Sequence, residues 1–211
     1  MLRSGPRSGP VLWLLSAQYF AVQVIVAAAW ERPYSWSANA ISDLGNTRCA
    51  RFSGRSVCSP LHLVMNASFV LLGLSMFAGA VLIGRRLAAG RAAETGFAFM
   101  ALAGVGTVLV GLFPENTVGL AHVGGAALPF VLGNLGLLVL GLSLPELPAG
   151  LRASTLAAGA VGVGGLALFL GHAYLGVGLG GMERVAAYPQ DVWLIAFGGY
   201  LLARPAAGVA R

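Results

Sequence analysis

The side chains of this 211-residue chain that are best suited to chemistry are its three histidines and seven carboxylic acids. Imidazoles can bind zinc, act as general bases or carry protons, and carboxylates can assist each of these tasks. The histidines are His62, His122 and His172, and the acids that we group with them are Glu31, Asp43, Glu115, Glu183 and Asp191. These residues are far apart in the sequence, so a shared site depends on how the chain folds.

A zinc site is one chemistry that these residues could support. The candidate ligands are His62, His122 and His172, with one coordination position left open for water if the metal is catalytic. The chain contains no H-E-x-x-H or comparable local signature. A metal site therefore remains an alternative whose ligands would have to converge in the folded protein.

A metal-free acid–base pair is a second possible chemistry. Glu115 or Asp43 would orient His122 as a general base, and Ser42 beside Asp43 is the candidate nucleophile. No G-x-S-x-G elbow frames Ser42, and Ser, Asp and Glu also serve as caps where helical turns begin. The candidate catalytic residues are His122, His172, Glu115 and Asp43, and the candidate ligand-binding residues are Asp43, Glu115, His122, His172 and Asp191.

The elements that must position these residues are membrane helices. With 57% hydrophobic residues, 9% charged residues and a mean hydropathy of +0.81, the chain cannot bury its apolar surface in a water-soluble core. A spanning helix needs about 20 mostly apolar residues. Such runs occur at 11–30, 61–84, 95–113, 118–143, 154–177 and 188–203. The predicted fold class is all-α: a polytopic membrane protein with six transmembrane helices in a compact bundle and a structured first outer loop.

The six runs form a single transmembrane domain over 11–203, between two cytoplasmic tails at 1–10 and 204–211. The first run is expected to remain as an anchor, because the apolar core of a cleaved signal is only about 7–15 residues long. The sixth run is the weakest, since Pro189, Gln190 and Asp191 occupy its start. We expect it to be short, tilted or polar at its outer end.

The arginines predict the orientation of the bundle. All 13 basic residues are arginine, and with the N-terminus inside, eight lie on the cytoplasmic side and five outside. Both termini are then in the cytoplasm, the protein is in the cytoplasmic membrane, and the grouped histidines and acids lie near the outer helix ends. The net charge of +6 is spread over both faces, which indicates attraction to anionic lipid headgroups and not binding of nucleic acid.

The longest polar segment is the first outer loop, at 31–60. It is too long for a simple connection, and Tyr34, Trp36 and Ile41 give it side chains to pack with, so we expect a cap on the helix ends. Cys49 and Cys58 lie in this loop, where an oxidising compartment would let a disulfide persist. Free thiols or a metal site are the alternatives, although the spacing fits neither C-x-x-C nor zinc-ribbon patterns.

Several short motifs also occur together in a known family. YSWSAN precedes ISDLG at 41–45, the second apolar run carries an asparagine in LHLVMNASFVLLG, and GLFPEN leads into AHVGGAALPF. In combination, over roughly 11–203, these elements resemble the bacterial integral membrane family known as domain of unknown function 998. The resemblance implies a six-span architecture and brings no established activity.

Three functions agree with this sequence. The first is a multi-pass membrane protein whose outward-facing polar pocket binds a lipid headgroup or a small polar ligand. The second is a membrane-embedded lipid hydrolase or transferase, with or without a metal such as zinc. The third, a small transporter using Asp191 and the histidines, is the least favoured, because no charge is expected in the middle of a span. Membrane lipids are the expected partners; the sequence indicates no nucleic acid, no soluble partner and no particular oligomeric state.

Overall fold

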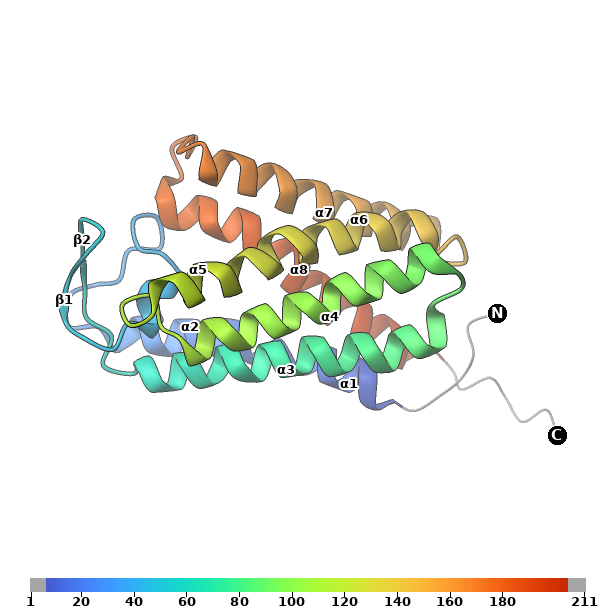
Figure 1. The fold of residues 1–211 in the computed structure, drawn as a ribbon, viewed down its shortest axis with the longest axis horizontal. Coiled ribbons are helices and arrows are strands. Elements are labelled where there is room, and N and C mark those ends of the chain that lie inside the picture. The colour runs from blue at the N-terminus through green and yellow to red at the C-terminus, as the bar shows by residue number, and fades with distance from the viewer. Residues whose placement is uncertain (1–6, 205–211) are drawn as a thin grey trace.

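The computed structural model describes residues 7–204, and most of this part is helical (Figure 1). Residues 1–6 and 205–211 lie outside the described part, and with them most of the two expected tails (1–10 and 204–211). The helices are α1 (Ser8–Leu15), α2 (Gln18–Ala28), α3 (His62–Leu87), α4 (Arg91–Leu112), α5 (Gly119–Ala127), α6 (Asn134–Ser143), α7 (Ala149–Leu170) and α8 (Gly178–Ala203). A π-helical turn, η2 (Leu128–Gly133), joins α5 to α6.

Five helical segments are long and apolar enough to cross a membrane: Ser8–Ala28, His62–Leu87, Arg91–Leu112, Gly119–Ser143 and Ala149–Leu170. The first combines α1 and α2, and the fourth combines α5, η2 and α6. They overlap the first five apolar runs of the sequence, and the fifth segment begins and ends several residues earlier than 154–177 indicates. The prediction of a helical membrane protein is therefore confirmed at the level of these five segments.

Helix α8 differs from the sixth apolar run. It begins at Gly178 and not at residue 188, and Pro189 lies inside the helix. The segment 178–187 contains three glycines, a glutamate and an arginine, which is why the sequence resembles a loop there. Its side chains Glu183 and Arg184 are nevertheless buried. Asp191 consequently lies near the middle of a helix and not at its polar start.

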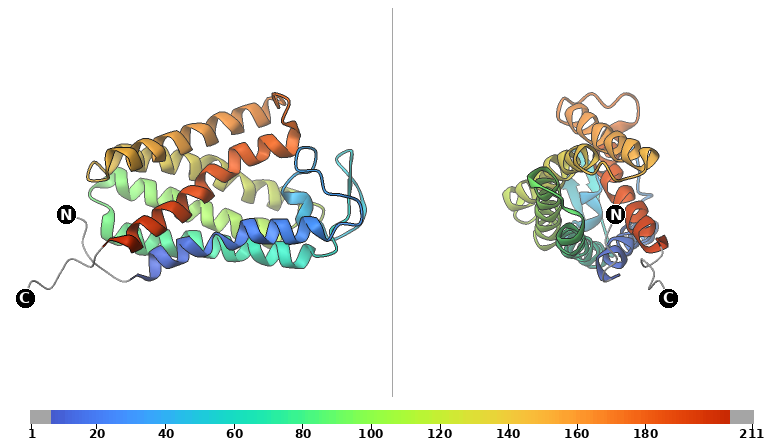
Figure 2. Two further views of the ribbon diagram at one scale, coloured as in Figure 1. Left: turned by 180° about the vertical axis from the view of Figure 1, so that it is seen from behind. Right: turned by 90° about the vertical axis from the view of Figure 1, so that its right-hand side faces the viewer.

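The helices lie side by side in one bundle (Figures 1 and 2). Helix α3 packs against α1, α2 and α4; α4 packs against α5, η2 and α6; and α7 packs against α6 and α8. Helix α8 also packs against α1, which closes the arrangement. The start of α1 and the end of α8 lie at one end of the bundle, and the connections α2–α3, α4–α5 and α7–α8 lie at the other. We call the latter the cap end.

Residues 29–61, the cap segment, connect α2 to α3 at the cap end. They contain a 3-10 turn, η1 (Ser42–Gly45), and two short strands, β1 (Ala50–Phe52) and β2 (Arg55–Val57). The strands pair antiparallel, with Arg51 opposite Ser56. A disulfide joins Cys49 to Cys58 at the open end of this hairpin. The structure thus confirms both the ordered loop and the cysteine pair.

Aromatic packing fixes the N-terminal helix at the end opposite the cap. The Trp13 ring lies 5.4 Å from that of Trp193 and 5.8 Å from that of Phe197, and its indole N–H donates to the carbonyl of Met76. A β-carbon on Gly79 of α3 would lie only 2.2 Å from the Trp13 ring, so the close approach of α1 to α3 requires glycine there. This cluster joins α1, α3 and α8, which together form one wall of the bundle.

Candidate functional site

The ISDLG motif (residues 41–45) lies across the cap end, and different elements hold its backbone. The Ile41 N–H donates to Glu183 Oε2 of α8 at 2.6 Å, and Asn66 of α3 donates to the Gly45 carbonyl at 2.9 Å. A β-carbon on Gly45 would lie 2.3 Å from Asn66 Oδ1, so a larger residue fits only if the Asn66 side chain or the turn moves. The asparagine of the second apolar run and the ISDLG glycine are therefore parts of one contact.

Asp43 is the structural centre of the cap segment. Its carboxylate is fully buried and accepts hydrogen bonds from Asn39 Nδ2 at 3.0 Å and the Ala40 N–H at 2.9 Å. Arg55 of β2 adds two more, from Nε at 2.8 Å and from an η-nitrogen at 2.9 Å. Burial alone would raise the pKa of Asp43, but the hydrogen bonds from Arg55 and Asn39 outweigh it and hold that pKa below its usual value.

The FPEN turn between α4 and α5 binds the cap segment. Asn46 donates to Glu115 Oε1 at 2.9 Å, and Asn116 both accepts from the Thr47 N–H at 3.2 Å and donates to its hydroxyl at 3.1 Å. The first turn of α5 has no side-chain cap, so these residues do not act as the helix caps that their position suggests. Burial, reinforced by the neighbouring Asp43 carboxylate, raises the pKa of Glu115 to about 8.

Ser42 and His122 form a hydrogen-bonded pair. Ser42 Oγ lies 3.0 Å from His122 Nε2, and His122 Nδ1 lies 2.9 Å from the Phe113 carbonyl oxygen. Because a carbonyl oxygen only accepts, the neutral imidazole carries its proton on Nδ1, and Nε2 accepts from the Ser42 hydroxyl. A backbone carbonyl therefore orients His122, and neither Glu115 nor Asp43 does so, contrary to the sequence hypothesis.

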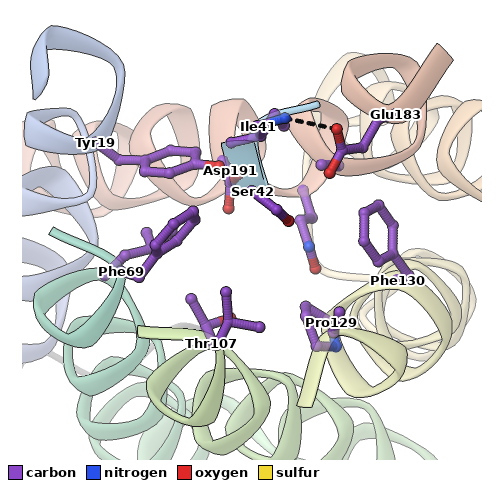
Figure 3. Close-up of a pocket in the computed structure, with 14 residues that line it drawn as sticks. Tyr19, Ile41, Ser42, Phe69, Thr107, Pro129, Phe130, Glu183 and Asp191 are labelled. Carbon is purple, nitrogen blue, oxygen red and sulfur yellow. Dashed lines mark hydrogen bonds between the residues drawn. The ribbon is translucent and has the colours of Figure 1, made fainter. Parts of the chain in front are cut away.

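A cavity of about 50 Å³ lies beneath ISDLG, between the helices (Figure 3). Because one water molecule needs about 10–15 Å³ of such a cavity, the cavity has room for about three to five water-sized groups. Ile41 and Ser42 of the ISDLG motif contribute to its lining, and Glu183 and Asp191 do so from α8. Aromatic and aliphatic side chains form most of the remaining wall, namely Tyr19, Phe69, Leu72, Val110, Pro129 and Phe130.

Asp191 is the exceptional residue of this cavity. It is only 3% exposed, its side chain points toward the cavity in Figure 3, and within residues 7–204 no hydrogen bond or ion pair reaches its carboxyl group. The neighbouring Gln190 also buries a side-chain oxygen that has no partner there. A buried carboxyl group without a partner is costly, and inside a membrane helix such a residue usually marks a functional site.

Arg184, which follows Glu183, forms no ion pair with the acids of the cavity within residues 7–204. Its guanidinium donates to the carbonyls of Trp36 at 2.9 Å and Gly180 at 2.8 Å and to the Tyr34 hydroxyl at 2.5 Å. It also lies 4.8 Å from the centre of the Trp36 ring. Arg184 is not among the site residues that the sequence predicts. The signal that could have selected it is an arginine directly beside a glutamate in a mostly apolar C-terminal third of the chain.

The three histidines do not converge. His62 begins α3 and bonds through Nδ1 to the Ser59 carbonyl at 3.0 Å. His172 is exposed in the α7–α8 connection, where its Nδ1 lies 2.9 Å from the Tyr174 hydroxyl. Among the described residues 7–204, no three His, Cys, Asp or Glu side chains are grouped so that they could hold a metal ion. The hypothesis of a zinc site, and of His172 acting together with His122, therefore loses the ligand set on which it depended.

Apolar helices of spanning length around a partly polar cavity define this chain as a helical membrane protein. The chain belongs to the family described as protein of unknown function (DUF998), which matches residues 14–200. Comparison with curated proteins and with solved structures finds no match. The family match confirms the resemblance, and the motifs that carried it, YSWSAN, ISDLG, the α3 asparagine, FPEN and the α5 histidine, meet at the cap end.

Proposed function

We propose that this protein crosses the cytoplasmic membrane six times and binds a small polar ligand or a lipid headgroup in an outward-facing pocket, the cavity beneath ISDLG. The observation that carries the proposal is the buried carboxyl group of Asp191, which points into this cavity without a partner in the described chain. A ligand with a group that hydrogen-bonds to, or forms an ion pair with, the Asp191 carboxyl group would be held in the cavity by that interaction.

The proposed topology uses α8 as the sixth span. Six passes agree with the start of α1 and the end of α8 lying at the same end of the bundle. That end carries the arginines expected on a cytoplasmic face, Arg85, Arg86, Arg91, Arg152 and Arg204. The disulfide lies at the opposite, cap end, and disulfides persist in oxidising compartments. Both termini are then cytoplasmic, and the cap segment faces outward.

The chemistry of the cavity favours a ligand with an ammonium group. An ionised carboxylate only accepts hydrogen bonds, and Asp191 and Glu183 both line the cavity. The rings of Tyr19, Phe69 and Phe130 offer π-faces, to which cations are attracted. Arg184 is directed at the cap segment. Asp191, and the Glu183 oxygen that does not bond to Ile41, are therefore the groups that would contact a ligand cation. The small volume fits the amine end of a molecule, either free in solution or as the headgroup of a membrane lipid.

Binding to purified protein tests this proposal. Ethanolamine and nanodiscs containing phosphatidylethanolamine would be titrated in parallel by calorimetry against the wild type, Asp191→Asn and Glu31→Gln. Glu31 is an exposed acid near the cap end and is the matched control. We expect at least one probe to bind, about tenfold or more weakly to Asp191→Asn, and unchanged to Glu31→Gln. The probe that binds identifies the source of the ammonium group, whereas no binding, or equal binding by Asp191→Asn, would refute the proposal.

Accessibility of the two cysteines tests the orientation separately. Intact cells would be reduced and then treated with a membrane-impermeant maleimide. The proposed topology predicts labelling of Cys49 and Cys58 without permeabilisation. Labelling that requires permeabilisation would place the cap segment in the cytoplasm.

A further inference from the structure

We infer that Ser42 and His122 are a nucleophile and its general base, and that the protein transfers the acyl group of a lipid ester through an acyl-serine intermediate. This activity goes beyond ligand binding and does not depend on Asp191. The inference rests on three observations: the geometry of the pair, the position of Ser42 in the lining of the cavity, and the absence of a helix cap formed by the Ser42 side chain.

The geometry is that of an activated serine. The separation of 3.0 Å between Ser42 Oγ and His122 Nε2 lies within the about 2.6–3.2 Å expected between a nucleophile and its base. The Phe113 carbonyl supplies the third group, because its hydrogen bond to Nδ1 fixes both the tautomer and the ring orientation. His122 is 5% exposed, so little water competes for its nitrogen atoms.

Ser42 is not needed to hold the turn in which it lies. A serine at this position usually caps backbone N–H groups, yet η1 has no side-chain cap. Other residues fasten the motif: Glu183 holds Ile41, Asn66 holds Gly45, and Ser59 donates to the Leu44 carbonyl. Ser42 instead contributes to the lining of the cavity, and its hydroxyl points inward in Figure 3.

The reaction needs only an ester and water or an acceptor alcohol. Ser42 Oγ attacks the carbonyl carbon, and the hydroxyl proton passes to His122 Nε2. The bond from that carbon to the leaving oxygen then breaks, and the leaving alcohol takes the proton from Nε2, which leaves the acyl group on Ser42. Water or a second alcohol repeats these steps in reverse order, releasing an acid or a new ester and restoring both residues.

The cavity wall suits an acyl substrate. Its apolar side chains, among them Phe69, Leu72 and Val110, can contact the first carbons of an acyl chain. Tyr19 and Gln190 line the same cavity and carry groups that can donate hydrogen bonds to a developing oxyanion. A fatty acyl ester of a membrane lipid is the substrate class that combines these requirements.

Covalent labelling tests this inference. Purified wild-type protein in detergent would be treated with an alkyl fluorophosphonate, and the modified peptide would be identified by mass spectrometry. We expect modification at Ser42, none in Ser42→Ala, and labelling slowed about 10²–10⁴-fold in His122→Gln, the range typical of a lost general base. Ser56→Ala, which changes an exposed serine of β2, should label at the wild-type rate. Folded wild-type protein that is not labelled at Ser42 would overturn the inference.

A second variant keeps the test decisive if His122→Gln does not fold. Both native cysteines are in the disulfide, so within the described chain Ser42→Cys would add the only free thiol. With His122 as its base, that thiol should react with iodoacetamide at least about tenfold faster than a matched thiol introduced by Ser56→Cys. Equal rates would show that His122 does not activate position 42.

The two proposals can fail independently. Wild-type protein that binds the ammonium probe but is not labelled at Ser42 would refute catalysis alone. Wild-type protein that is labelled at Ser42 but binds no ammonium probe would refute the binding proposal alone.

Discussion

Replacing Arg55 by alanine should destabilise the protein more than any other single change in the hairpin. Arg55 makes two hydrogen bonds to Asp43, a carboxylate with no exposed surface. Removing one partner of a buried ion pair costs about 3–5 kcal/mol. The Arg55 side chain is 17% exposed, and Asn39 and the Ala40 N–H remain bonded to Asp43. We therefore expect a smaller loss of about 2–3 kcal/mol in the free energy of unfolding.

Thermal unfolding in detergent would measure this loss. For a protein of this size, about 2–3 kcal/mol corresponds to a decrease in Tm of about 4–12 °C. Arg51→Ala is the matched control, because the Arg51 side chain is on the same hairpin, is exposed and, among residues 7–204, bonds only to the Gly54 carbonyl. It should change stability by less than about 0.5 kcal/mol. Asp43→Asn combined with Arg55→Ala should recover part of the loss, since no uncompensated charge then remains buried.

The acid dependence of this effect follows from the lowered pKa of Asp43. A carboxyl group whose pKa is depressed in the folded state stabilises the protein above its unfolded pKa, and that stability disappears as the pH falls through the folded pKa. The difference between Arg55→Ala and the wild type should therefore be full at pH 7 and shrink below about pH 4. A variant as stable as the wild type at pH 7 would refute the central role assigned to Asp43.

Three further predictions concern the cap end. Gly45→Ala should lower the unfolding free energy by about 1–3 kcal/mol, because the new methyl group overlaps the amide oxygen of Asn66 in α3. Gly124→Ala places its methyl group in open space and should cause no such loss, and thermal unfolding would distinguish the two variants. The raised pKa of Glu115 means that wild-type stability falls as the pH rises from about 4.5 to about 8, and Glu115→Gln should flatten that slope. Replacing Cys49 and Cys58 by serine should cost about 2–3 kcal/mol, and a reductant should then have no further effect on Tm.

Much of the fold follows from composition and periodicity. Five apolar runs mark five helices, since a bilayer leaves few alternatives to helical hydrogen bonding. The apolar pattern predicts α8 only from residue 188 on, because the first ten residues of the helix are rich in glycine and carry Glu183 and Arg184. Those two side chains are satisfied by the cap segment, about 140 positions earlier in the chain, with separations of 142 between Ile41 and Glu183 and 148 between Trp36 and Arg184. Local pattern carries no information about partners at that distance.

The site was predictable in its residue types but not in its pairings. Ser42, Asp43, Glu115, His122 and Asp191 could all be selected from their chemistry and motifs. The structure places the first four at the cap end and Asp191 in the wall of the cavity beneath it. Which of them face the cavity depends on the path of the loop. A backbone carbonyl that orients an imidazole leaves no trace in a sequence, because every residue has one.

The bonds from Glu183 and Arg184 also constrain the order of events on the ribosome. Both side chains belong to the last helix of the described chain, whereas the backbone that they hold, around residues 36–41, emerges far earlier. On the proposed topology, the loop can close its hairpin and disulfide soon after export, yet residues 36–41 lack their contacts to Glu183 and Arg184 until α8 has been translated. A chain that terminates prematurely after α7 would therefore leave residues 36–41 of the cap segment without their contacts to α8. Quality-control proteases would then meet an unanchored loop.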